Sequence, residues 1–78
     1  MHIISNDMNL TQMAPGKPAR IIGISGGHGI RQKLLLRGLS EGNLVRVISN
    51  TGPVTIEVDR NIVSIGRGVA RKIQVAEV

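Results

Sequence analysis

The amino-acid sequence predicts a small, mainly β protein: a partly closed β-barrel of about five short strands with one inserted helix. The chain has no Phe, Tyr or Trp, so its core must consist of Ile, Val, Leu and Met, and the β-branched residues among these are typical of strands. Short β-branched runs alternate with turn residues along most of the chain. A helical pattern occurs among them at residues 24–42. Because closure protects edge strands, we expect a barrel.

The length and composition predict one domain. A chain of 78 residues with 41% hydrophobic content lies near the lower size limit for a stable core. We expect residues 1–8 to form a flexible tail and residues 9–78 the folded domain. The N-terminus lacks the features of a secretion peptide, and no stretch approaches the roughly 20 apolar residues of a membrane span. Cysteine is absent, which fits a reducing compartment, so we expect a soluble, cytoplasmic protein.

Strand positions follow from β-branched runs bounded by turn residues. Val54–Val58 is the clearest, since apolar and polar residues alternate with a period of two, which predicts one buried face. Asp59–Asn61 predicts a short reversal and therefore a hairpin. Single helical turns are expected at residues 9–13, begun by Asn9, and at residues 66–70. The five expected strands are residues 17–24, 44–48, 54–58, 62–65 and 73–78.

The helix of residues 24–42 is expected to span two to three turns between glycine turns. Ser25 can accept amide hydrogens of the first turn, and Gly38 permits a left-handed exit. At about 100° per residue, one face should carry Ile30, Leu34 and Leu35, and the other Gln32, Lys33 and Arg37. The turns that we expect the fold to require are Gly26, Gly27, Gly38, Gly42, Gly52 and Pro53.

The charge predicts an acidic partner. Ten Lys and Arg against five Asp and Glu give a formal charge of +5, which attracts nucleic acid, an anionic membrane face or an acidic protein. Lys33 and Arg37 are four residues apart on the expected helix. Arg67, Arg71 and Lys72 cluster around the last helical turn. If the two groups are neighbours they form one positive patch; the alternative is an ordinary solvated surface.

Several kinds of site are disfavoured by the residues present. We predict no metal site, because His2 and His28 are the only histidines and no carboxylates are spaced to join them. We also predict no cofactor and no catalysis, since no acid is placed to orient His28 beside Ser25. The glycines around His28 are expected to be a structural turn rather than an anion cradle. Binding of single-stranded nucleic acid or Pro-rich peptides normally uses aromatic side chains, which this chain lacks.

The order and spacing of these motifs resemble the FeoA family of bacterial ferrous iron transport, and the related barrel domain of diphtheria-toxin-repressor-type metal regulators. The resemblance covers roughly residues 10–75. It rests on Leu10, Pro15-Gly16, Ile24, Gly26-Gly27, Arg31, Leu34, Gly38-Leu39, Gly42, Val45, Val47, Gly52-Pro53, Ile56, Val58, Ala70, Ile73 and Val75.

The resemblance implies an SH3-like barrel. It also implies a non-enzymatic accessory protein of ferrous iron uptake whose partner is the cytoplasmic part of FeoB, the G-domain permease, with any role of a transition metal indirect. One departure is visible: Arg37 stands where the family usually has Leu or Met, and the extra apolar residue is Leu36. Leu36 or Leu39, if exposed, could contact a partner. The candidate partner-binding residues are Lys33, Leu36, Arg37, Arg67, Arg71 and Lys72.

Alternatives remain open at this point. The charge and the repressor resemblance allow a regulatory domain that binds nucleic acid, which without a helix-turn-helix would bind only through backbone phosphates. Strand addition at an open sheet edge and weak self-association are further routes to a partner.

Overall fold

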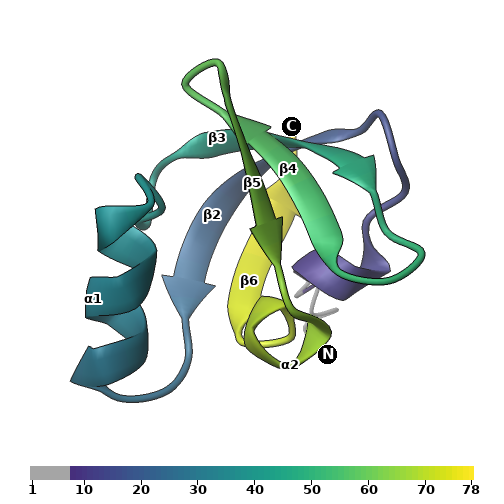
Figure 1. The fold of residues 1–78 in the computed structure, drawn as a ribbon. Helices are drawn as coiled ribbons and strands as arrows, with labels where there is room; N and C mark the ends of the chain where they lie inside the picture. Colours follow the sequence, from purple (N-terminus) through teal and green to yellow (C-terminus); the bar gives the residue numbers. More distant parts are fainter. Residues whose placement is uncertain (1–7) are drawn as a thin grey trace, which may run out of the picture.

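A single antiparallel sheet forms most of the protein, whose computed structural model describes residues 8–78. The strand order is β1-β6-β2-β3-β4-β5, and the sheet curls around its inner face (Figure 1). Helix α1 is inserted between β2 and β3, and two single turns, η1 and α2, follow β1 and β5. The elements are β1 (Met8–Asn9), η1 (Leu10–Gln12), β2 (Pro18–Ile24), α1 (His28–Leu36), β3 (Leu44–Ser49), β4 (Val54–Val58), β5 (Asn61–Ile65), α2 (Arg67–Ala70) and β6 (Ile73–Glu77).

The predicted aliphatic core is confirmed. Among the described residues no buried side chain is polar or charged. Strand β4 shows the expected alternation, with its three apolar residues buried and the residues between them half-buried. The fully buried large side chains are Leu10, Met13, Ile21, Leu39, Ile56, Ile73, Val45, Val47, Val54 and Val75.

The sheet has one strand more than predicted. Met8 and Asn9 form β1, in which Met8 pairs with Val75 of β6. The flexible tail expected at residues 1–8 is therefore wrong for Met8, and residues 1–7 lie outside the described residues. A two-residue strand has no period that a sequence pattern could show. Within residues 8–78, the two outer strands, β1 and β5, pair with one neighbour each and not with each other.

The start of α1 differs from the prediction. Ser25 does not cap the helix: its amide donates to the carbonyl of Lys72 at 2.7 Å, and its hydroxyl contacts Gln74 Oε1 at 3.1 Å. The N-cap is Gly27, and no side chain caps the helix. Gly26 makes the turn, with φ of +108°. The glycine turn therefore begins the helix, and the side chain of Ser25 connects this turn to β6 by its hydrogen bond to Gln74.

The end of α1 is as predicted. Gly38 has φ of +82°, and two backbone hydrogen bonds of 2.9 Å, from Gly38 to Leu35 and from Leu39 to Leu34, close a Schellman turn. Leu39 is fully buried, so the prediction that it could contact a partner is wrong. A Schellman turn brings the residue after the glycine back against the last turn of the helix, which explains this burial.

One residue on the predicted buried face of α1 is exposed. Leu34 is buried and Ile30 half-buried, but Leu35 is 61% exposed. With about 100° per residue, Leu35 lies about 140° from Ile30, whereas Arg37 lies only about 20° from it. The prediction for Leu35 was wrong because its neighbour Leu34 fills the packed stripe. Arg37 consequently borders that stripe.

The hairpin of β4 and β5 is confirmed. The turn contains two residues, Asp59 and Arg60, and Val58 pairs with Asn61. Both turn residues have positive φ, 50° and 69°, as two-residue hairpins with a type I′ turn require. Near the N-terminus, Asn9 begins η1 as predicted, and with Gln12 it completes a capping box.

Candidate partner-binding site

Two predicted basic residues line one groove. Lys33 of α1 and Arg37, directly after this helix, line the groove together with Ile65, Gly66 and Val69, which lie at the end of β5 and in the following turn. Ile30 and Leu34 of α1 complete the lining, and the groove has a volume of about 220 Å³. The site therefore combines an aliphatic interior with two cations on its helical wall.

Arg37 also bridges the two walls of this groove. Its Nη1 donates a hydrogen bond of 3.0 Å to the backbone carbonyl of Ser64 in β5. Arg37 is the C-cap residue of α1, so the contact connects the end of the helix to an outer strand of the sheet. Arg37, which stands where the family usually has Leu or Met, therefore makes a structural contact that neither of those residues could make.

Leu36 stands on α1 beside the groove and is 89% exposed. Leu35, next to it, is exposed as well, but it lies on the opposite side of the helix and lines a separate depression with Arg31 and Glu41. Isolated exposed leucines are common on protein surfaces, but Leu36 follows Lys33 by three residues and adjoins Arg37, so it is exposed beside two cations. We call the residues Lys33, Leu36 and Arg37 the α1 surface.

The guanidinium of Arg67 makes its hydrogen bonds within the protein. Its Nη1 donates to Asn50 Oδ1 at 2.8 Å, to the Gly52 carbonyl at 3.0 Å and to the Asn50 carbonyl at 3.3 Å. Asn50 in turn donates from Nδ2 to the carbonyls of Thr11 and Met13 at 2.7 and 2.9 Å. Arg67 therefore ties α2 to the loop before β4, and Asn50 ties that loop to η1.

The other two predicted basic residues, Arg71 and Lys72, are exposed and follow α2 directly. The backbone of Lys72 accepts the hydrogen bond from Ser25, at the loop that leads into α1. Their side chains make no hydrogen bond or ion pair among those of the described residues. Their role in partner binding stays a prediction.

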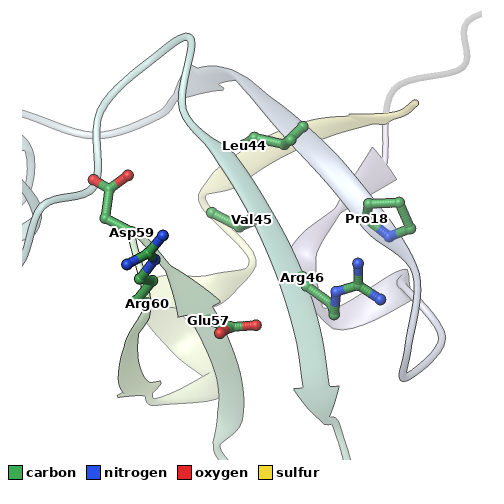
Figure 2. Close-up of a pocket in the computed structure, with 7 residues that line it drawn as sticks. All are labelled: Pro18, Leu44, Val45, Arg46, Glu57, Asp59 and Arg60. Atoms are coloured by element: carbon green, nitrogen blue, oxygen red, sulfur yellow. The ribbon is translucent and has the colours of Figure 1, made fainter.

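A second, shallower depression lies on the outer face of the sheet and has a volume of about 180 Å³. Figure 2 shows its mixed charge, with Glu57 and Asp59 among the same side chains as Arg46 and Arg60. Arg46 and Glu57 are directly opposite each other on β3 and β4. A depression that contains both signs has no net preference for an acidic partner, unlike the groove beside α1.

His28 is the first residue of α1 and is exposed. Within residues 8–78, no three His, Asp or Glu side chains lie close enough together to hold a metal ion. The single ion pair of these residues joins Arg31 to Glu41 at 3.1 Å. None of the helices described is long and apolar enough to cross a bilayer.

Comparison with known proteins identifies the family. The model of the FeoA domain matches residues 8–77. The chain belongs to the FeoA domain family. The resemblance seen in the sequence is thereby confirmed. A curated FeoA relative from Methanocaldococcus jannaschii, named Putative Fe(2+) transport protein A, is 40% identical over 55 residues, which are 69% of this chain and 67% of that protein.

Solved structures confirm the SH3-like fold. A crystal structure named Iron Uptake Regulatory Protein (FeoA) is 34% identical and superimposes with a TM-score of 0.87 over 95% of this chain and 100% of that one. IdeR of T. acidophilum is 26% identical with a TM-score of 0.88, over 100% of this chain and 37% of IdeR. The FeoA protein from Chlorobium tepidum, 20% identical with a TM-score of 0.82 over 91% of this chain and 70% of that one, shares the fold.

The far wall of the groove was missed by reasoning from the sequence. The sequence predicts Ser64 and Ile65 in a strand and Val69 in a helical turn, but no part of a binding site at any of them. Arg37 and Ser64 are 27 residues apart in the chain, and no local pattern connects them. The only available signal was the basic residue at a position where the family usually has an apolar one.

Proposed function

We propose that this FeoA domain is a non-enzymatic, cytoplasmic accessory protein of ferrous iron uptake, and that its α1 surface binds the cytoplasmic region of a FeoB-type permease. The observation that carries the proposal is Leu36, which is 89% exposed between Lys33 and Arg37. Interfaces combine an apolar centre with a polar rim and are enriched in arginine, and Leu36 with Arg37 offers both. The names of the relatives refer to Fe(2+) transport and iron uptake, and for this reason we propose iron uptake as the process.

The charge supports an acidic partner surface. The α1 surface contains two cations and no carboxylate, and the carboxylate of Glu41 is already paired with Arg31. Complementary charge accelerates association and selects among partners. Arg67 is left out of the proposed interface, because the loop before β4 occupies its guanidinium.

The test is the affinity of the purified cytoplasmic region of the permease for two triple variants. The first changes the α1 surface by Lys33→Glu, Leu36→Ser and Arg37→Glu. The control makes the same kinds of change on exposed residues elsewhere, by Lys17→Glu, Leu44→Ser and Arg46→Glu. We expect the first to lose at least about tenfold in affinity and the control to lose less than about threefold.

Equal losses in the two variants would contradict the proposed surface. No binding by the unchanged protein would contradict the proposed partner. A titration with duplex DNA at rising salt, on the same unchanged protein, examines the alternative drawn from the charge of +5, because binding through phosphates weakens steeply with salt.

A further inference from the structure

Strand β5 has one side that no other strand of residues 8–78 pairs with. It is the last strand in the order β1-β6-β2-β3-β4-β5, and β4 is its one partner among the described strands. Four of its five residues are exposed or half-buried, and Ile62 is 61% exposed. An unpaired edge of this kind can accept a further strand.

The register identifies which backbone groups are free. Val58 and Asn61 flank a two-residue turn, and such flanking residues exchange both backbone hydrogen bonds. Along an antiparallel pair, bonded and non-bonded residues alternate. Ile62 and Ser64 are therefore the residues whose amides and carbonyls point away from β4. The hydrogen bond from Arg37 to the Ser64 carbonyl agrees with this, because Arg37 approaches from the side opposite β4.

Arg37 occupies the edge without closing it. Its guanidinium bonds to the Ser64 carbonyl at 3.0 Å on an exposed surface. The amide of Ser64 and both backbone groups of Ile62 make no hydrogen bond to another loop or side chain of the described part of the chain. A single exposed hydrogen bond stabilises little, because water can take the place of either partner, so an incoming strand can replace it.

The groove beside this edge indicates the chemistry of the incoming strand. It is lined by aliphatic side chains and by Lys33 and Arg37, without a carboxylate. Its volume of about 220 Å³ is below the roughly 300–1,000 Å³ of pockets that enclose small molecules. An aliphatic side chain of a peptide fits a space of this size, and an acidic residue complements the two cations.

We infer that the free edge of β5 binds an extended, acidic segment of a partner protein as an additional strand. The backbone of this segment pairs with Ile62 and Ser64, one of its aliphatic side chains enters the groove, and its carboxylate binds Arg37 after Arg37 leaves the Ser64 carbonyl. This inference deepens the proposed function and depends on it only for the source of the segment, the cytoplasmic region of the permease.

The experiment uses the full chain labelled with 15N and the synthetic peptide acetyl-Thr-Val-Glu-Val-Glu-Val-Thr-amide, added up to the order of 1 mM, a concentration that detects weak binding. We expect the largest amide shifts at Ile62 and Ser64, with slower hydrogen exchange at both. The peptide with Lys in place of Glu should bind at least about tenfold more weakly. N-methylation of its central amides should abolish binding, because a methylated amide cannot donate to the edge.

Two variants separate the backbone from the side chain. Ile62→Pro removes an outward amide that β4 does not use and should abolish peptide binding, while Ile62→Thr keeps that amide and should bind within about threefold of the unchanged protein. If Ile62→Pro does not fold, the N-methylated peptide makes the same distinction. Absence of binding, equal binding of the Lys peptide or of the methylated peptide, or shifts confined to other strands would overturn the inference. Concentration-dependent shifts at β5 without peptide would instead assign the edge to a second copy of this chain and overturn it too.

The peptide result is independent of the permease. A peptide that binds β5 while the permease region does not bind would contradict the proposed function and leave the edge intact. A permease region that binds Ile62→Pro as well as the unchanged protein would contradict the edge and leave the proposed function intact.

Discussion

Asn50 Oδ1 accepts a hydrogen bond of 2.8 Å from Nη1 of Arg67, 17 residues later in the chain. The same amide group donates through Nδ2 to two carbonyls near η1. One half-buried side chain thus connects α2, the loop before β4 and η1. The connection requires an amide, because it uses one acceptor and two donors of the same group.

Asn50→Asp should lower the free energy of unfolding by about 2 kcal/mol. The backbone carbonyls of Thr11 and Met13 lose their hydrogen-bond donor and face a carboxylate oxygen instead. Urea unfolding measures this change. Asn61→Asp is the control, because Asn61 is exposed and its side chain makes no hydrogen bond among those of residues 8–78. A control as destabilised as Asn50→Asp would show that the network does not matter.

Gly38→Ala should destabilise the protein by about 1 kcal/mol, because an L-residue with a side chain is strained at positive φ. The space at Gly38 is open, with no atom within 4 Å of an added Cβ, so the backbone conformation alone causes the loss. Gly68→Ala is the control: it is equally open, has no positive φ and lies in α2, where alanine favours the helix. Thermal unfolding should show a lower midpoint for the first variant and an unchanged or higher one for the second.

Arg60→Gly should stabilise the protein by about 1 kcal/mol, because glycine adopts positive φ without strain at the second position of a type I′ turn. Arg71→Gly removes the same charge at a residue with φ of −64°, and no gain is expected there. The comparison is made by chemical unfolding at equal ionic strength. A gain of the same size in both variants would attribute the effect to charge repulsion rather than to the turn.

Leu39→Ala and Leu36→Ala should have opposite consequences. Leu39 is fully buried, and its truncation should cost about 2–5 kcal/mol of unfolding free energy. Leu36 is 89% exposed, so its truncation should leave stability within about 0.5 kcal/mol and weaken binding of the permease region. The prediction fails if Leu36→Ala unfolds at the same urea concentration as Leu39→Ala.

Local patterns were sufficient for most of the fold. The alternation of Val54–Val58, the Asn9 cap and the glycine exit at Gly38 each depend on neighbours within a few residues, and each was predicted correctly. Leu36 was singled out because it carries the apolar residue that the family usually has at position 37, and the structure shows that Leu36 is exposed. Each of these features depends on residues close together in the sequence, and for this reason one sequence was enough to predict them.

The errors involve residues whose surroundings come from distant parts of the chain. Ser25 was expected to cap α1, but its hydrogen-bond partners are Lys72, directly before β6, and Gln74 in β6. Partner binding by Arg67, predicted from its charge, stays a prediction, but its guanidinium already donates to a loop that begins 17 residues earlier. Charge does not reveal whether a guanidinium already has acceptors inside the fold. The same limit applies to the contact between Arg37 and Ser64.

Chemical-shift mapping on the 15N-labelled protein with the purified cytoplasmic region of the permease tests the central claim most directly. The proposed function predicts that the amides of Lys33, Leu36 and Arg37 shift or broaden as the permease region is added, while those on the outer face of β3 and β4 do not. A spectrum that stays unchanged at saturating permease region, or one whose shifts lie only around Arg46 and Glu57, would contradict it.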